Sequence, residues 1–300
     1  MKRYSFIFLL IFLLVDSGFV LHGEMVVFQT VSGRRVEVSG RSFQPGEVLK
    51  ITIDRTASID KATVHFLDKK LPMLMVGSQK HFSSLIGLDL DVKAGAYPLR
   101  IRIDYKNGSV EMANSRLLVT DKEFPVKELW VKEEYVTPPP ETLDRIRRES
   151  RLLRLLYTRL TPNWLGEGNF CLPLQGKVFP NFGERRIFNN KPRSPHGGVD
   201  ISAPSGTPVA ASNSGTVVLA EDLYFAGKTV IIDHGLGVFS MYCHFSEILA
   251  DEGEKVRKGD VIGEVGATGR VTGPHLHWGI KIHNSRVDPF SLLSLVLEQD

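Results

Sequence analysis

Two short stretches rich in glycine and histidine constrain the fold of this 300-residue chain more than any other feature. In His275-Leu276-His277 one residue separates the histidines, and side chains alternate faces along a strand, so both rings should leave the same face. His196 and Asp200 would also share a face, but four extended residues span about 13 Å, too far for two ligands of one metal ion. The chain between them must bend, and Gly197-Gly198 is the pair best able to bend it. The pattern predicts imidazole and carboxylate groups at a spacing that suits a metal ion.

Three segments of the chain carry a resemblance to a known family. They read His196-Gly-Gly-Val-Asp200-Ile-Ser-Ala-Pro-Ser-Gly-Thr-Pro-Val, Met241-Tyr-Cys-His244-Phe and Gly266-Ala-Thr-Gly-Arg-Val-Thr-Gly-Pro-His275-Leu-His277-Trp. Through them the chain resembles, from about residue 170 to residue 290, the lysostaphin-type (LytM-like) zinc metalloendopeptidases, which cut peptide bonds in bacterial peptidoglycan. The resemblance implies a zinc-dependent endopeptidase that hydrolyses peptidoglycan cross-links, on an antiparallel β fold with an open groove.

The resemblance also assigns roles to five residues. It implies that His196, Asp200 and His277 bind one Zn2+ per chain, although spacing alone leaves open whether His275 or His277 is the ligand. A catalytic zinc site keeps one position for water beside three protein ligands, and that water becomes the nucleophile. Proton transfer needs further groups, and the resemblance gives these catalytic roles to His244 and His275. The chain contains no His-Glu-x-x-His sequence, which excludes a thermolysin-type base.

Two other functions are compatible with the sequence. One is a non-catalytic LytM-like regulator of other cell-wall hydrolases, because some relatives of this fold keep the shape and lose the metal, whereas here the ligand set is complete. The other, a general metalloprotease acting on folded proteins, is disfavoured because no extended subsite pattern is present. Peptidoglycan is the expected partner, and other cell-envelope proteins are candidates for the amino-terminal domain or the arginine-rich helix. The balance of 37 basic and 34 acidic residues argues against nucleic acid.

The first residues have the character of an export signal. Met1-Lys2-Arg3-Tyr4 is basic, and the apolar run over residues 5–15 has the length of a secretory signal and is short for a membrane span. Leu21-His22-Gly23 is a poor cleavage site, so residues 1–23 are either a signal peptide or an uncleaved signal anchor. Both interpretations predict an exported protein of the periplasm or cell envelope, in the second case anchored to the inner membrane.

Turn residues and hydrophobic periodicity divide the rest of the chain into three parts. Residues 24–120 show short strands separated by turns such as Asn107-Gly108, which predicts an immunoglobulin-like β-sandwich. Residues 121–168 form a connector with an amphipathic helix over about 141–160, in which leucines recur at three and four residues and arginines cover the rest. This linker helix either packs on a domain with a solvated outer face or offers a basic surface to a partner. By the resemblance, residues 169–300 form a LytM-like metallopeptidase domain, and the chain is predicted to be mainly β.

The strands expected in the metallopeptidase domain cover residues 216–220, 229–233, 238–244, 261–265 and 275–282. Alternation along residues 238–244 points Cys243 away from Tyr242 and His244, into the core. Cys171 and Cys243 are then two buried thiols or, if Cys171 lies on a neighbouring strand, a disulfide.

A few other polar residues are structural or weaker candidates. His234 precedes a glycine turn, and we expect a structural role for it, as for the isolated His65 and His81. Arg185 and Arg186 lie upstream of the His196 segment and could meet a substrate carboxylate. That last expectation rests on charge alone.

Overall fold

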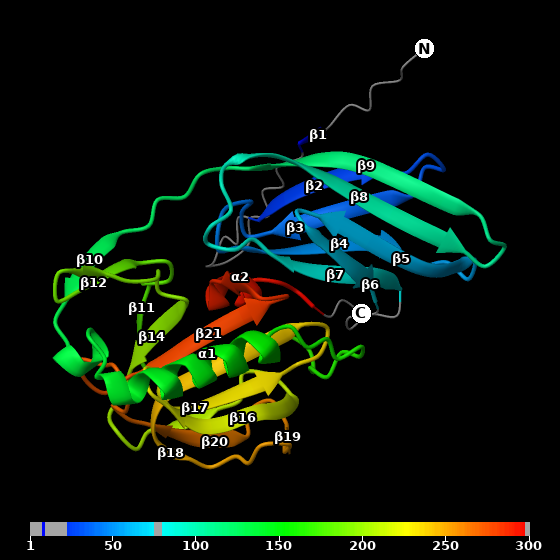
Figure 1. The fold of residues 1–300 in the computed structure, drawn as a ribbon. Helices are drawn as coiled ribbons and strands as arrows, with labels where there is room; N and C mark the ends of the chain where they lie inside the picture. The colour runs from blue at the N-terminus through cyan, green and yellow to red at the C-terminus, as the bar shows by residue number, and fades with distance from the viewer. Residues whose placement is uncertain (1–7, 10–22, 75–79, 298–300) are drawn as a thin grey trace, which may run out of the picture. The chain divides into compact units, whose positions relative to one another are not determined.

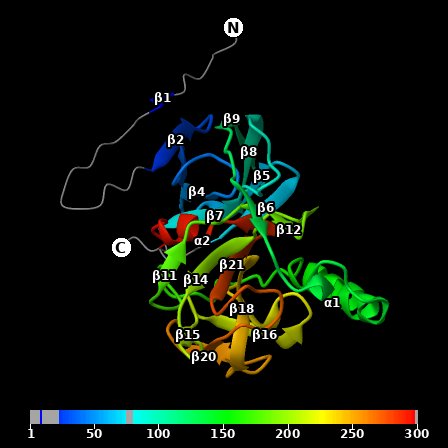
Figure 2. The same ribbon diagram turned by 90° about the vertical axis from the view of Figure 1, so that its left-hand side faces the viewer.

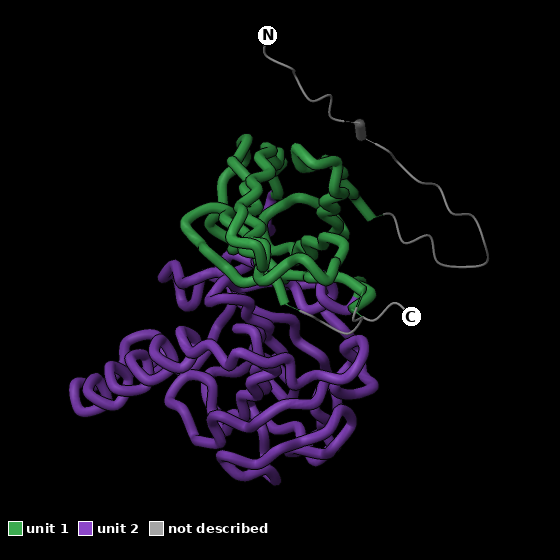
Figure 3. Tube along the Cα trace, turned by 90° about the vertical axis from the view of Figure 1, so that its right-hand side faces the viewer, with its two compact units in different colours: residues 1–122, 294–300 green, residues 123–293 purple. Residues whose placement is uncertain are grey.

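The computed structural model describes residues 8–9, 23–74 and 80–297, and antiparallel strands dominate it, as Figures 1 and 2 show from two directions. The expected signal, residues 1–23, lies outside the described residues except for residues 8–9 and 23. Among the described residues, no helix combines the length and the apolar character needed to cross a membrane. The chain forms two compact units, Met1–Lys122 with Ser294–Asp300 and Glu123–Leu293 (Figure 3). The domain boundaries expected at residues 120 and 168 stay a prediction.

The first unit consists of two antiparallel sheets. One contains, in spatial order, β1 (Phe8–Leu9), β2 (Glu24–Gln29), β3 (Arg35–Gly40), β4 (Val48–Asp54) and β7 (His81–Gly87). The other contains β6 (Lys69–Met73), β5 (Ile59–Phe66), β8 (Gly95–Tyr105) and β9 (Val110–Val119). The expected turn at Asn107-Gly108 joins β8 to β9, and Gly108 adopts the positive φ that such a turn requires.

One apolar core is shared by both sheets of the first unit. Ile51 of β4 belongs to the same buried cluster as Val64 of β5 and Ile101 of β8. Two sheets around one core agree with the predicted β-sandwich, while its immunoglobulin-like character stays a prediction. Neither His65 nor His81 belongs to a group of possible metal ligands within the described part of the chain.

The second unit is organised around a ten-stranded sheet. Its main path runs through β11 (Lys177–Phe179), β14 (Gly198–Ser202), β21 (Leu276–Ile282), β18 (Val238–Ile248), β17 (Gly227–Asp233), β16 (Gly215–Leu223) and β19 (Lys255–Val256). The strand β20 (Val261–Val265) pairs with β18 and with β15 (Pro208–Ala210), and β22 (Ser285–Val287) pairs with β21 ahead of helix α2 (Pro289–Leu293). All the strands expected from the sequence are present, although β16 and β18 extend further than predicted and β21 begins at Leu276.

A second sheet of this unit is built partly from the segment expected to be a connector. It contains β10 (Val126–Leu129), β12 (Arg185–Phe188) and β13 (Lys191–Pro192), with β10 parallel to β12. Two 3-10 turns follow β10, η1 (Glu133–Tyr135) and η2 (Pro140–Thr142), and the second leads into helix α1 (Leu143–Leu156). The helix is shorter than the expected 141–160 because the proline-rich entry forms a 3-10 turn and the backbone N–H of Tyr157 already closes the last turn.

Helix α1 packs on the sheet of the second unit. Leu156 and the following Tyr157 belong to one buried cluster with Leu219 and Phe239, and the Tyr157 ring meets the Phe239 ring edge-on at 5.5 Å between centroids. The buried Glu149 also anchors the helix, since its carboxylate accepts the backbone N–H of Tyr224 at 2.8 Å. Four arginines of the helix are exposed: Arg147, Arg148, Arg151 and Arg154. The helix therefore packs on its own unit, as the first interpretation expects, while the use of its exposed basic face by a partner stays a prediction.

The two cysteines do not form a disulfide. Cys171 and Cys243 are both free thiols, so the disulfide alternative is wrong. Cys243 is buried as expected, whereas Cys171 is partly exposed. The second unit is therefore held together without a covalent cross-link between these two residues.

Replacing Leu156 by alanine should lower the free energy of unfolding of the second unit by about 2–4 kcal/mol, because the side chain is 1% exposed and its removal leaves a cavity. The change Leu155→Ala is the matched control, since Leu155 is 58% exposed and should cost less than about 0.5 kcal/mol. Trp130, Trp164 and Trp278 all lie in the second unit, so tryptophan fluorescence in urea reports its unfolding. Equal losses in the two variants would show that α1 is not packed as described.

Candidate metal centre

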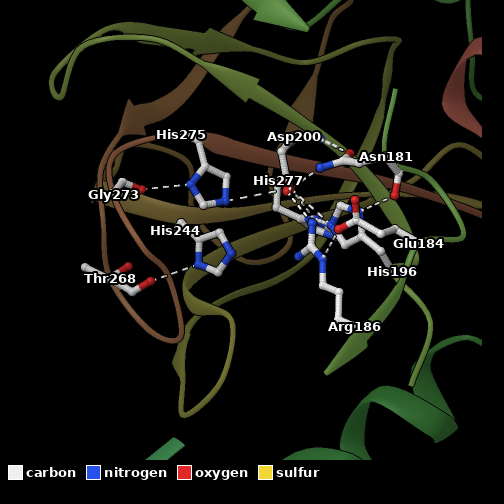
Figure 4. A network of polar contacts seen from close by, with 10 residues as sticks. All are labelled: Asn181, Glu184, Arg186, His196, Asp200, His244, Thr268, Gly273, His275 and His277. Carbon is white, nitrogen blue, oxygen red and sulfur yellow. Dashed lines mark hydrogen bonds and ion pairs between the residues drawn. The ribbon is translucent and has the colours of Figure 1, made fainter. Parts of the chain in front are cut away.

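Three side chains from neighbouring segments converge on one point (Figure 4). Asp200 on β14 lies directly opposite His277 on β21, and His196 comes just before β14. Nε2 of His196 lies 2.8 Å from Nδ1 of His277, and each of these nitrogens lies 3.1 Å from Oδ1 of Asp200. This trio is a possible metal-ion site, and its members are those that the family resemblance implied.

The protonation of His196 suits metal binding. Its Nδ1 lies 2.9 Å from the backbone oxygen of Asn181, and a carbonyl oxygen can only accept, so Nδ1 carries the proton. In the neutral ring Nε2 then offers a lone pair to the centre of the trio. Burial lowers the pKa of His277, against the opposing hydrogen bond with Asp200, so the His277 ring tends to be neutral.

The donor distances fit one divalent ion. Three ligands of a tetrahedral site with bonds of about 2.0–2.1 Å lie about 3.3 Å from one another, only slightly further apart than the 2.8 and 3.1 Å found here. Two neutral imidazole nitrogens and a carboxylate oxygen are also donors that such an ion prefers. The trio could therefore accept a metal ion with movements of a few tenths of an ångström.

Gly198 makes the convergence possible. A Cβ atom at this position would lie 2.4 Å from the backbone oxygen of Trp278 and 2.9 Å from Cε1 of His277. Only glycine therefore lets β14 approach β21 so closely while the chain turns from His196 to Asp200. The sequence predicted that glycines would bend the chain here, and Gly198 has this second, steric role as well.

The other carboxylate oxygen of Asp200 is held by the protein. Oδ2 accepts hydrogen bonds from Arg186 at 2.7 Å and from Nδ2 of Asn181 at 2.9 Å, while Nε of Arg186 binds Glu184 at 3.1 Å. Burial tends to raise the pKa of Asp200, but hydrogen bonds and charge from His196 and His277 hold it well below the usual range. Arg186 is thus engaged by Asp200 and Glu184, and contact of Arg185 or Arg186 with a substrate carboxylate stays a prediction.

His275 and His244 lie beside the trio with the same proton arrangement. Nδ1 of His275 donates to the backbone oxygen of Gly273 at 2.8 Å, and Nδ1 of His244 donates to that of Thr268 at 2.8 Å. The two rings lie 4.9 Å apart between centroids, and Nε2 of His275 lies 3.7 Å from Oδ1 of Asp200. In the neutral rings each Nε2 is unprotonated, so both histidines can accept a proton there.

His244 reaches the site through an unusual backbone conformation. Its φ is +67°, a left-handed value that non-glycine residues rarely adopt, and such strain is often found at functional sites. Burial, with the nearby His277 and His275, lowers the pKa of His244 to about 3, so the ring is neutral near pH 7.

The orientation of Cys243 differs from the expected one. Cys243 is the cross-strand partner of His277 and lines the same cavity as His244, so it does not point away from His244, although its side chain is buried as expected. Tyr242 does point inward and is fully buried. The alternation that predicted a shared face for Tyr242 and His244 ends because the left-handed conformation turns His244 toward the site. Cys243 is not among the possible ligands of the trio.

His234 is a structural residue, as the sequence predicted. It is fully buried, donates from Nδ1 to the backbone oxygen of Ser214 at 2.8 Å, and forms a hydrogen bond of 2.7 Å between Nε2 and the hydroxyl of Ser240. Burial lowers its pKa from 6.5 to about 4. The residue fixes the turn after β17 as a neutral hydrogen-bonding group.

Comparison with known proteins identifies the family. The family model "Peptidase family M23" matches residues 194–289, which contain the trio, His244 and His275. The crystal structure of a protein assigned to peptidase M23 from Pseudomonas aeruginosa is 31% identical, with a TM-score of 0.65, over 84% of this chain and 96% of that one. The chain belongs to peptidase family M23. The family expected from the resemblance is thereby confirmed.

Two M23 relatives are similar over the metal-site region. Peptidoglycan DD-endopeptidase ShyA of Vibrio cholerae is 42% identical over 113 residues, which cover 37% of this chain and 26% of ShyA. DD-carboxypeptidase/endopeptidase Mpg of Neisseria meningitidis is 45% identical over 97 residues, which cover 32% of this chain and 22% of Mpg. The chain thus spans about a quarter of the length of these curated relatives. M23 peptidases depend on a metal ion, in agreement with the trio of His196, Asp200 and His277.

The stability of the second unit should fall as the pH decreases from 6.5 to 4, in part because of His234. Its pKa is about 4 in the folded protein and about 6.5 in the unfolded chain, so between these values the unfolded chain binds more protons. This residue alone should remove roughly 3 kcal/mol over that interval. Urea unfolding followed by tryptophan fluorescence at several pH values should show a shallower dependence for His234→Asn, and an unchanged one for the control His81→Asn in the first unit. An equal pH dependence in all three proteins would contradict the assignment.

Proposed function

We propose that this chain is a zinc-dependent endopeptidase that hydrolyses the peptide cross-links of bacterial peptidoglycan. The observation that carries the proposal is the convergence of His196, Asp200 and His277 beside two histidines whose Nδ1 atoms are already engaged. Membership of family M23 supports the reaction class. The names of ShyA, a peptidoglycan DD-endopeptidase, and of Mpg, a DD-carboxypeptidase/endopeptidase, support wall peptides as the substrate.

Zinc suits this donor set. Three protein ligands drawn from histidine and a carboxylate, with a further position left open, are typical of catalytic zinc sites. His196, Asp200 and His277 would hold the ion, and Arg186 and Asn181 would orient Asp200 through its second oxygen. When bound, zinc supplies Lewis-acid chemistry by lowering the pKa of a water molecule and polarising a carbonyl group.

Two histidines are assigned to proton transfer. His244 is neutral near pH 7, and its Nδ1 donates a hydrogen bond to the backbone oxygen of Thr268. Its Nε2 can therefore take up a proton from a water molecule at the scissile bond. His275 has the same tautomer, and its Nε2, 3.7 Å from Oδ1 of Asp200, is placed to act near the reacting group. One ring accepts the proton of the nucleophile, and the other steadies the intermediate or delivers a proton to the departing nitrogen.

We also propose that the protein works outside the cytoplasm, in the periplasm or cell envelope. The basic Met1-Lys2-Arg3-Tyr4 and the apolar run after it support export, and the substrate is found there. Fractionation of cells that express a tagged protein tests this. Recovery in the cytoplasm alone would rule it out.

Digestion of purified peptidoglycan tests the proposed function directly. Mass spectrometry of the released peptides should show new termini at a cross-link, and the Asp200→Ala protein should release none. A non-catalytic regulator would release no peptides in either form, and its function in cells would survive the Asp200 change. The complete ligand set favours the enzyme.

The changes His196→Ala, Asp200→Ala and His277→Ala should each lower the zinc content far below one ion per chain, because three ligands leave no redundancy. Metal analysis after dialysis measures this. His81→Ala, in the first unit, is the matched control and should keep full occupancy. Full zinc in the His277→Ala protein would show that the ligands are wrongly assigned.

His244→Ala and His275→Ala should keep their zinc and lose about 10²- to 10⁴-fold in kcat, the contribution typical of a general acid or base. Both quantities can be measured on one preparation by metal analysis and by peptide release from soluble wall fragments. Loss of zinc in either variant would place that histidine among the metal ligands. Retention of activity in both would leave proton transfer to other groups.

A further inference from the structure

Arg270, in the loop between β20 and β21, has no role in the site described above. Its guanidinium carbon lies 4.7 Å from the centroid of the Phe188 ring and 4.8 Å from that of the Phe225 ring. Burial, with the nearby Arg193 and Arg186, lowers its pKa to about 10, so the group is still charged near pH 7. Two aromatic faces thus hold a positive charge that is expensive to bury.

The charge of Arg270 is not neutralised by the protein. Its recorded hydrogen bond is made by the backbone N–H, to the oxygen of Phe225 at 2.9 Å, and no acidic group of residues 23–74 or 80–297 forms an ion pair with its guanidinium. The neighbouring arginines differ, since Arg186 binds Glu184 and Asp200, and Arg193 donates to the backbone oxygen of Val136. A planar guanidinium packed against two aromatic rings carries its N–H donors in its own plane, where they can bind a carboxylate in a bidentate manner.

Arg270 also lies beside the candidate catalytic groups. It lines two cavities of the second unit, of about 260 and 210 Å³, and His244 lines both of them as well. The same loop orients His244, because the backbone oxygen of Thr268 accepts a hydrogen bond from Nδ1 of His244. Gly269, at φ +74°, lies against the backbone of Gly227, and its conformation brings Arg270 back over Phe225.

The lining of the two cavities favours an anionic ligand. Their charged side chains are Lys127, Arg186 and Arg270 on the positive side and Asp200 on the negative side. Asp200 is already engaged by Arg186 and by the histidines of the trio. A substrate carboxylate placed here meets an excess of positive charge and an unused set of donors.

We infer that Arg270 binds a substrate carboxylate next to the scissile amide and thereby selects cross-links that carry one. The inference rests on the proposed peptidase function. This carboxylate is attached to the carbon that bears the scissile nitrogen, as it is where the amide nitrogen is the α-amino group of an amino acid. A link to a side-chain amine lacks it. Arg270 is thus a specificity-determining residue, and it leaves metal binding and proton transfer to the other groups.

A pair of peptides tests the inference with the full-length, zinc-loaded protein. Both contain a D-alanyl-meso-diaminopimelyl bond, and they differ in whether the carbon beside the scissile nitrogen bears a carboxylate or a carboxamide. Cleavage gives kcat and KM, and the corresponding N-acetylated product peptides give a Kd without any need for cleavage. The wild-type protein should prefer the carboxylate by about 10- to 100-fold in kcat/KM and should bind its product more tightly.

Variants at this position should change the preference and leave the zinc in place. Arg270→Gln should abolish the preference, and Arg270→Lys should keep only part of it, because an ammonium group lacks the planar fork. Arg193→Gln is the matched control, since it removes a neighbouring charge that is bonded to the backbone, and it should keep the full preference. Zinc content and tryptophan fluorescence report whether each variant is folded.

The possible outcomes separate the inference from the proposed function. Equal cleavage and equal binding of the two peptides by the wild-type protein would overturn the role of Arg270 while leaving the peptidase function intact, and this comparison needs no variant. An Arg270→Gln protein that loses activity equally on both peptides would overturn it too. If neither peptide is cleaved, the proposed function fails, and the Kd values of the two products still decide whether Arg270 recognises the carboxylate.

Discussion

The pairing of β21 with β14 on one side and β18 on the other is the constraint on which the site depends. His277 lies opposite Asp200 in one pair and opposite Cys243 in the other, while Trp278 faces Tyr242 in the core. Backbone hydrogen bonds fix this register, and a slip of one residue would turn every side chain of β21 to the other face. The donor distances near 3 Å are therefore a consequence of sheet pairing, with Gly198 permitting the close approach.

Backbone carbonyl groups set where the protons lie in the site. Three histidines donate a hydrogen bond from Nδ1 to a main-chain oxygen. The pairs are His196 with Asn181, His244 with Thr268, and His275 with Gly273. None of these oxygens belongs to a strand of the main sheet, so loops outside that sheet select the tautomers of the three rings. The protonation pattern of the site therefore depends on these loops as well as on the β scaffold.

The parts of the structure that follow local patterns could be predicted from the sequence. Strand alternation predicted that His275 and His277 face one point, and both lie within 4 Å of Oδ1 of Asp200. Helix α1 and the strands β16, β17, β18, β20 and β21 were found because their periodicity is regular, whereas β14 and the other short strands of the second unit were not predicted. The contacts of Asn181 and Glu184 could not be found, because loop residues that act through long-range hydrogen bonds leave no periodic pattern. The left-handed φ of His244 was equally invisible, and it is why the prediction that Cys243 points away from His244 was wrong.

The short loop from Thr268 to Arg270 combines two duties in three residues. The carbonyl oxygen of Thr268 accepts a hydrogen bond that orients the His244 ring. The guanidinium of Arg270 packs against the rings of Phe188 and Phe225. Such a loop cannot be exchanged as an independent module, since any insertion that moved the arginine would also shift the carbonyl. Natural variants and designed hybrids of this enzyme class would have to keep this loop whole, together with Phe188 of β12, whose ring packs against the arginine.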